Sequence, residues 1–440
     1  MMLSEPVDRH ARLTSTDAAA WGGNAFGQSF WLVVAIVFVV LVTVSGETEY
    51  AKLGGEEVYD NLTTGSTFTR QIAFLALAGM SAGCLLFLPP PLGKEMYWPL
   101  LFPFFSLLAL VNLSTLWSDI PSMTIKRAIV ISIMVMTGLI MGRIWDARRF
   151  ALAIVLLSGG FLILSIATEV YYRSFFMADY RFSGIFHPSK QAFTCGLMAI
   201  ASTALFFETK QKRFLLLLAI AIGFVILTKS RTGLAATLIA TATIGWSQFT
   251  WNQRFMAAVA GTIIGIGGFL AISVLKPSYE IEKVALLGRD EESADPRKLT
   301  GRLPIWTHAI EEFSERPILG FGYGAFWSKK RLEKYERLNG WALTHSHSAY
   351  IEALVNVGTI GFITGLGIVL AAYARFWRLK QEASTRLAGR LFFAILTLAL
   401  LAGLTEIAFI GDGYEAWVLS STLGFACFSG KSGQEGSPGL

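Results

Sequence analysis

His345 and His347, which are separated by one residue, are the side chains of this 440-residue chain best suited to move a proton. A neutral imidazole, with a reference pKa near 6.5, accepts a proton from a hydroxyl at ambient pH. In an extended segment both rings point to one side, whereas on a helix they would diverge by about 200°. The pair predicts a general base, with either residue in that role; the alternative is a structural pair at a helix N-cap. A metal would need a third ligand, which is not evident, so none is expected.

Arg231 lies in a polar interruption, residues 228–232, of an apolar run that extends from 214 to 248. A single span would be far too long, and burying Lys229 and Arg231 in mid-bilayer would cost about 2.5 to 3.5 kcal/mol each. We therefore expect two short helices, with the turn that carries Arg231 drawn into the outer membrane face or into a water-filled cavity. An arginine at that depth is a candidate binding group, and the alternative is a side chain that only reaches the headgroups.

A second set of cationic or hydrogen-bonding side chains, Arg181, His187 and Lys190, lies in the loop 179–191, where a predicted helix begins at Pro188. Exposed backbone N–H groups and the helix dipole favour an anion at such a position. The combination suits a phosphate. The alternative is a polar loop whose proline only defines the helix entry.

Arg302 opens an amphipathic helix that the sequence predicts within the polar stretch 276–349. Apolar residues recur there at helical spacing, namely Ile305, Trp306, Ala309, Ile310 and Phe313. This pattern is typical of a helix that lies on the membrane or on a helix bundle. The segment 320–324 is rich in glycine but lacks the spacing of a nucleotide loop, which predicts a tight turn. Carboxylates at 290–295 alternate with basic residues, which indicates a solvated surface rather than a metal site.

The elements that position these groups are predicted to be membrane helices. The chain is 53% hydrophobic and 15% charged with a mean hydropathy of +0.53, which excludes a soluble protein. Its basic residues fall between apolar runs, where they set orientation, so nucleic acid is not an expected partner. The three cysteines lie in apolar runs without a CxxC pair, which indicates packing rather than disulfides or metal ligation.

Twelve apolar runs approach the length of about 20 residues that a hydrocarbon core of roughly 30 Å requires. They lie at 30–45, 71–89, 97–116, 125–142, 150–168, 189–207, 214–228, 232–248, 254–275, 350–374, 390–410 and 413–429. The expected fold is all-α and polytopic, with about 12 transmembrane helices. Its predicted parts are a cytoplasmic tail (1–29), nine helices (30–275), a large periplasmic loop containing helices (276–349), three helices (350–429) and a cytoplasmic tail (430–440).

Orientation follows from the basic residues. With the N-terminus inside, the internal segments hold sixteen Lys and Arg, and the short external segments hold nine. This bias predicts both termini in the cytoplasm and the large loop outside. The turn at Trp117 is interpreted as an anchor at the membrane interface.

Four motifs in one order resemble the O-antigen ligase and polymerase family, which includes exopolysaccharide polymerases of the succinoglycan type. They are Arg181 to Pro188; Ser230-Arg231-Thr232-Gly233; Gly301-Arg302 with Trp306 and the Pro317 to Gly322 turn; and His345-Ser346-His347 with Tyr350, Glu352, Leu354 and Gly358. The resemblance is strongest over residues 180–375. The chain departs from the family at Ser189 and Ser348, where the family often has Asn.

The resemblance implies a metal-independent, inverting glycosyltransferase with a GT-C-like fold in the bacterial inner membrane, active on the periplasmic face without a cofactor. The donor would be a glycan on undecaprenyl pyrophosphate and the acceptor a second glycan or lipid A core, with membrane lipid, a chain-length regulator and a flippase as further partners. By position, Arg231, Arg302 and Arg181 match family arginines thought to hold the pyrophosphate. His347 matches the histidine proposed to activate the acceptor, and His345 is the second catalytic candidate. The supporting residues are His187, Lys190, Trp306 and Tyr350.

Three alternatives remain open at this stage. A lipid-linked repeat unit as acceptor would make the protein a polymerase, which the loop and tail pattern favours, and lipid A core would make it a ligase. A multi-pass transporter or lipid-glycan flippase would be expected to show an internal repeat or polar groups along a path, and neither is visible. A structural scaffold would leave Arg231 and His347 without a role.

Overall fold

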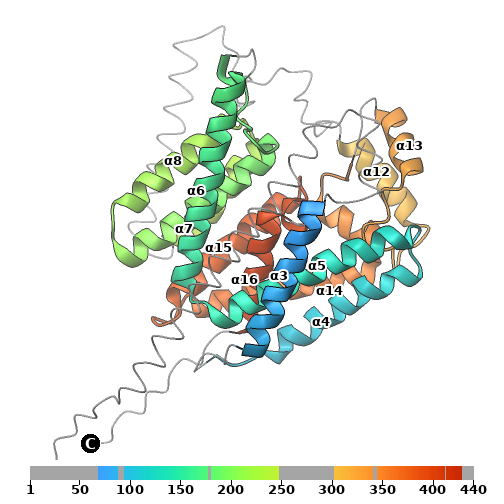
Figure 1. Cartoon of the computed structure of the whole chain (residues 1–440), viewed down its shortest axis with the longest axis horizontal. Coiled ribbons are helices and arrows are strands. Elements are labelled where there is room, and N and C mark those ends of the chain that lie inside the picture. The colour runs from blue at the N-terminus through green and yellow to red at the C-terminus, as the bar shows by residue number, and fades with distance from the viewer. Residues whose placement is uncertain are drawn as a thin grey trace, which may run out of the picture.

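The computed structural model describes residues 68–87, 94–176, 180–246, 302–339, 344–411 and 413–428, and its regular elements there are all helices (Figure 1). They are α3 (Phe68–Phe87), α4 (Trp98–Leu113), η1 (Ser114–Leu116), α5 (Pro121–Ile144), α6 (Ala147–Tyr172), η2 (Ser174–Phe176), α7 (Pro188–Thr209), α8 (Arg213–Leu227), α9 (Arg231–Trp246), α12 (Arg302–Phe313), α13 (Lys329–Asn339), α14 (Ala349–Leu379), α15 (Arg386–Gly403), η5 (Ala408–Ile410) and α16 (Tyr414–Cys427). The predicted all-α class is confirmed. Both predicted tails, the predicted runs at 30–45 and 254–275, and the carboxylates at 290–295 lie outside the described residues.

Within the described ranges, six helices are long and apolar enough to cross a membrane, and α8 is apolar but shorter. The six are Trp98–Leu116, Pro121–Ile144, Ala147–Tyr172, Pro188–Thr209, Ala349–Leu379 and Arg386–Gly403. The chain is therefore a multi-pass membrane protein. The expected division of the 214–248 run into two helices is confirmed by α8 and α9, with the polar turn between them. The predicted run 390–410 is wrong in its second half, because α15 ends at Gly403 and a turn follows.

Helices α5 and α16 pack with their backbones in direct contact. Gly138 faces the backbone of Ser420, and Gly142 faces the backbone of Gly424, so a Cβ at either glycine of α5 would collide with α16. Small residues allow this approach, and in a bilayer close packing replaces the hydrophobic driving force between helices.

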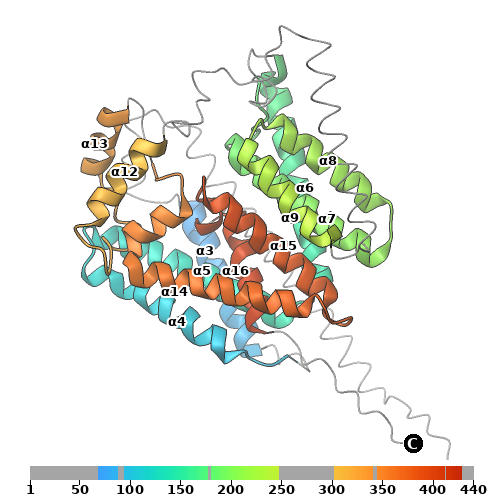
Figure 2. The same ribbon diagram turned by 180° about the vertical axis from the view of Figure 1, so that it is seen from behind.

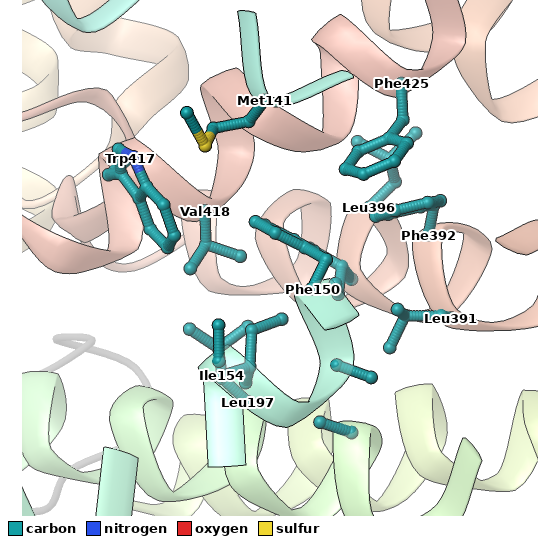
Figure 3. Packing of buried hydrophobic residues seen from close by; sticks show 14 of the residues in the cluster. Met141, Phe150, Ile154, Leu197, Leu391, Phe392, Leu396, Trp417, Val418 and Phe425 are labelled. Carbon is teal, nitrogen blue, oxygen red and sulfur yellow. The ribbon is translucent and has the colours of Figure 1, made fainter. Parts of the chain in front are cut away.

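An aromatic cluster joins α6, α15 and α16 beside this contact (Figure 3). The ring of Phe150 lies 5.4 Å from that of Trp417, and the rings of Phe392 and Phe425 stack at 4.4 Å between centroids. All four side chains are nearly or fully buried. Figures 1 and 2 show α15 and α16 between the α6–α9 group on one side and α3, α4, α5 and α14 on the other. The cluster thus holds the two groups of helices together.

Helices α7 and α9 run in the same direction, which brings their N-termini to the same end of the bundle. A Cβ at Gly233 would meet Ala192 at 2.6 Å, and one at Gly196 would meet Thr237 at 2.5 Å, four residues further along both helices. The start of α9, Arg231, therefore lies at the same end as the start of α7.

Connections that the sequence assigns to opposite sides of the membrane lie at opposite ends of the bundle. At one end, the turn between α4 and α5 meets the large loop, since the backbone N–H of Asp119 donates to Phe321 O at 3.2 Å. At the other end, Tyr97 N–H donates to Cys427 O at 2.8 Å, and Lys94 Nζ donates to Gly142 O at 2.8 Å. This grouping agrees with the predicted order of spans. The assignment of the first end to the periplasm stays a prediction from charge.

An ion-pair network fixes α12 and α13 to the bundle. Arg331 of α13 contacts Glu312 of α12 at 2.6 Å and Asp119 of the α4–α5 turn at 2.9 Å. Its guanidinium also lies 4.2 Å from the ring centre of Phe321. Trp117 Nε1 donates to Leu319 O at 3.2 Å, so this tryptophan binds the loop, a role that the interface-anchor interpretation did not include.

The predicted glycine-rich turn is confirmed, and it presents its backbone to α14. Gly320 and Gly322 have φ values of 66° and 98°, a region that glycine adopts without steric cost. Phe321 N–H donates to Val355 O at 2.9 Å. Gly358, with a φ of 68°, interrupts α14 where the turn packs, and a Cβ there would collide with the backbone of Ile318.

Candidate active site

The two histidines lie in a short turn, residues 344–348, directly before α14. The ring centroids of His345 and His347 are 4.2 Å apart, which confirms that both side chains lie on the same side. His345 Nδ1 lies 2.7 Å from Thr344 Oγ1. His347 has a φ of 53°, in the left-handed region that residues other than glycine rarely adopt. The turn is therefore neither a helix nor a plain extended strand.

Helix α12 brings two of the predicted residues to this turn. Arg302 and Trp306 are four residues apart and so lie on one face of the helix. Trp306 Nε1 donates to Ser346 O at 2.8 Å, and Arg302 Nη2 lies 2.8 Å from Glu406 Oε1. The start of α12 is thus connected both to the histidine turn and to the segment after α15.

Glu406 is the central residue that the sequence did not predict. One carboxylate oxygen contacts Arg302, and the other lies 3.7 Å from His347 Nδ1. The side chain is 10% exposed. Burial alone would raise the pKa of Glu406, but its interaction with His347 and the charges of His347 and Arg302 outweigh burial and lower the pKa to about 2. The carboxylate is therefore ionised at neutral pH and connects a guanidinium to an imidazole.

His187 and Arg181 approach the same group of charges from the loop before α7. His187 is the N-cap of α7, where its Nδ1 accepts the Ser189 N–H at 3.4 Å. Partial burial of the ring lowers the pKa of His187 below its ordinary value; Glu406 opposes this shift, and Arg181 adds to it. Arg181 Nε donates to Thr228 O at 3.2 Å, in the turn between α8 and α9. The structure thus brings together His187, Arg181, Arg302, His347 and Glu406.

Arg231 begins α9 at the same end of the bundle and is partly buried. It follows the turn that Arg181 contacts. The described part of the chain contains no hydrogen bond or ion pair of the Arg231 guanidinium. Its place beside the cluster therefore rests on the position of this turn alone.

The remaining two predicted residues have other contacts. Lys190 lies 3.9 Å from Glu415, a fully buried carboxylate of α16 that also accepts the Thr194 hydroxyl at 2.6 Å. Its expected place beside a bound phosphate is therefore taken, at least in part, by an internal ion pair. Tyr350 donates its hydroxyl to Leu400 O at 2.7 Å, which ties the start of α14 to α15.

The cluster carries more positive than negative charge. Arg181 and Arg302 are permanent cations, whereas Glu406 supplies one negative charge. His345 is neutral, since burial lowers its pKa to about 3. His345, His347 and Glu406 have possible ligand atoms within 4.8 Å of one another. Because Arg302 already occupies one oxygen of Glu406 and the surroundings are cationic, these residues suit an anion better than a divalent cation.

Fold and site together define a class: a multi-pass membrane protein with a cationic site, at one end of its bundle, that combines guanidinium groups, imidazoles and one carboxylate. Residues 215–366 match the family model described as O-antigen ligase, which confirms the resemblance drawn from the motifs. The matched residues include Arg231, Arg302, His345 and His347.

Two relatives agree with this family. The chain is 25% identical over 283 residues to the exopolysaccharide production protein ExoQ of Rhizobium meliloti, covering 61% of this chain and 63% of that protein. It is 27% identical over 206 residues to an O-antigen ligase of Pseudomonas aeruginosa, covering 47% of this chain and 44% of that protein. The matches thus span less than two thirds of either relative.

Proposed function

We propose that this protein transfers a glycan from a lipid pyrophosphate to a sugar hydroxyl in the biosynthesis of a bacterial surface polysaccharide. The observation that carries the proposal is the chain of contacts from Arg302 through Glu406 to His347, because it connects an anion-binding group to a proton acceptor. The family match and the relative named for exopolysaccharide production support the same class of reaction.

The donor pyrophosphate is held by arginines. Displacement of a lipid pyrophosphate develops negative charge on the leaving group, and guanidinium forks match phosphate oxygens with two hydrogen bonds. Arg302 and Arg181 reach the cluster, and Arg231 follows the turn that Arg181 contacts. These groups stabilise the leaving group electrostatically, in place of a metal ion.

His347 is the general base for the acceptor. It takes the proton of the acceptor hydroxyl, whose oxygen bonds to the anomeric carbon while the bond to the pyrophosphate oxygen breaks with its electron pair. Direct displacement inverts the anomeric centre. Glu406 stabilises the imidazolium that forms. His345 is the weaker candidate, because a group with a pKa of about 3 is a poor proton acceptor at neutral pH.

The favoured acceptor is a second lipid-linked repeat unit, which makes the protein an exopolysaccharide polymerase of the inner membrane, active on the periplasmic side. The relative named as an exopolysaccharide production protein supports this choice and covers more of the chain. The second candidate, ligation of O-antigen to lipid A core, is supported by the relative named as an O-antigen ligase.

A deletion strain that lacks its polymer tests the proposal. It is complemented with wild type, His347→Ala or Arg302→Ala at matched membrane expression, and polymer and lipid-linked repeat units are measured. Single repeats that accumulate on the lipid in both variants support the polymerase. Normal free polymer that fails to reach lipid A core indicates the ligase. Normal polymer in both variants contradicts the glycosyltransferase and favours a transporter. A chelator added to membranes is expected to leave wild-type activity unchanged.

A further inference from the structure

Glu352, one turn into α14, is a carboxylate whose hydrogen-bonding capacity is filled by groups from three segments. Trp327 Nε1 donates to both of its oxygens, at 2.9 and 3.0 Å. Ser346 donates its backbone N–H at 3.2 Å and its hydroxyl at 2.9 Å, and Asn356 Nδ2 donates at 3.0 Å. The donors thus come from the large loop, the histidine turn and α14 itself.

Ser346 is the residue between the two histidines, and it is fully buried. Its carbonyl is bound by Trp306 at 2.8 Å, so both the N–H and the C=O of this one residue are fixed from outside the turn. Its hydroxyl has a single proton and two acceptors within reach, Glu352 and Ser348 O, each at 2.9 Å. The charged carboxylate is the stronger acceptor.

The conformation of His347 requires such support. A φ of 53° is unfavourable for a residue with a Cβ, and it persists only where the surroundings over-determine it. Ser346 directly precedes His347, so bonds that fix Ser346 also fix the direction in which the imidazole leaves the backbone. Without them, the turn is free to relax toward a negative φ, which would rotate His347 away from Glu406.

We infer that Glu352 is a positioning residue for the reaction: its carboxylate holds the histidine turn in the strained form that directs His347 toward Glu406 and the acceptor. This inference rests on the proposed function, because it assigns Glu352 no contact with substrate and lets it act only through His347. Trp327 and Asn356 orient the carboxylate, and Trp306 fixes the opposite side of the turn.

A double-mutant cycle tests the inference, with purified protein and lipid-linked repeat units extracted from the deletion strain. Glu352→Gln is expected to lower kcat by about tenfold to a hundredfold, since a displacement of about 1 Å at a catalytic group has effects of this size. KM for the lipid-linked donor is expected to change by less than about twofold, because Arg181, Arg231 and Arg302 are untouched. Glu315→Gln, at an exposed position of the large loop, serves as the control of matched chemistry.

The decisive comparison is made in the His347→Ala background. If Glu352 acts only through His347, Glu352→Gln has no further effect on the residual rate there. The same fold-loss in both backgrounds, or a wild-type kcat for Glu352→Gln, would overturn the inference. If the Gln variant does not reach the membrane, Ser346→Ala replaces it in the same cycle. A wild-type rate for His347→Ala alone would instead contradict the proposed function.

Discussion

Two turns supply the histidines of the site, and in each turn a serine is bound by a glutamate. In the turn before α7, Glu169 Oε1 accepts the N–H of Ser183 at 3.0 Å and that of Gly184 at 2.8 Å, with the Ser183 hydroxyl at 3.3 Å. In the turn before α14, Glu352 accepts the N–H and the hydroxyl of Ser346. The residue directly after each serine, Gly184 or His347, has a positive φ value.

The two glutamates differ in what else they bind. Glu352 also accepts hydrogen bonds from Trp327 of the large loop and from Asn356 of α14. It therefore connects the histidine turn to both of these segments. Among the described residues, Glu169 accepts hydrogen bonds from Ser183 and Gly184, both of the turn before α7, and its Oε2 is buried with no hydrogen-bond partner. The turn with the proposed base is therefore held in one arrangement from several directions. The turn with Arg181 is held by a carboxylate that has one oxygen without a hydrogen bond from the described part of the chain, so it is fixed from fewer directions.

The largest effect is expected at Glu406, where charges from the two turns meet. Glu406→Gln keeps the shape of the side chain but removes the charge that faces Arg302 and His347. Since a positioned general base contributes about 10²- to 10⁴-fold, we expect the turnover rate to fall by about a hundredfold or more. The rate is measured on purified protein with lipid-linked repeat units. A loss of less than about fivefold would mean that the two turns work without this connection.

A smaller effect is expected from pH, through His345. Its folded pKa of about 3 lies below the ordinary value near 6.5, so the unfolded chain takes up a proton first as the pH falls. The contribution of His345 to the free energy of unfolding is fully present above about pH 6.5. It is lost as the pH falls toward 3, by at most about 1.4 kcal/mol per pH unit. We expect the melting temperature of the detergent-solubilised protein to decrease between pH 7.5 and pH 5.

Two variants separate this contribution from that of other groups. His345→Gln is expected to show a weaker decrease in melting temperature over the same pH range, whereas His308→Gln, in the large loop, is expected to behave as wild type. His187, whose pKa burial also lowers, contributes in the same direction in wild type and in both variants. Equal pH dependence in wild type and His345→Gln would show that the histidine turn is not the source.

The smallest effect is expected at Glu169. Glu169→Gln leaves an acceptor oxygen for Ser183 and Gly184 but removes the charge, and the change affects only the turn that carries Arg181 and His187. We expect KM for the lipid-linked donor to rise about threefold with kcat nearly unchanged, since an interaction made equally in ground and transition states is weakened. If kcat falls as much as in Glu352→Gln, the contrast between the two turns is wrong.

The helices could be predicted from the sequence because a membrane imposes one length on every span. The runs at 125–142 and 150–168, for example, lie within α5 and α6. His345 and His347 could be selected from residue type and spacing, whereas Arg302 was selected through the family resemblance; their roles stay predictions. Helix α13 was not predicted, because it is strongly charged and only two of its residues, Leu332 and Tyr335, are apolar and buried, too few to reveal a helix in the sequence.

The carboxylates of the site were missed for a different reason. Glu406 lies inside an apolar run, where it appeared to be part of a span, although an ionisable residue in such a run is itself a signal of function. Lys190 was predicted to face a phosphate, and no local pattern indicates that Glu415 lies opposite it. Pairings between residues so far apart in the chain depend on helix packing, which a single sequence does not determine.

The glycine turn has a consequence for exchanging parts between relatives. Phe321, Gly322 and Thr359 donate backbone N–H groups across the contact between this turn and α14, to Val355 O, Asn356 O and Pro317 O. Segment 302–339 and the first ten or so residues of α14 therefore form one transferable module. A chimera that takes the loop of a relative should have its junction beyond Ile360. A junction at the start of α14 would separate the turn from the helix that accepts its backbone hydrogen bonds.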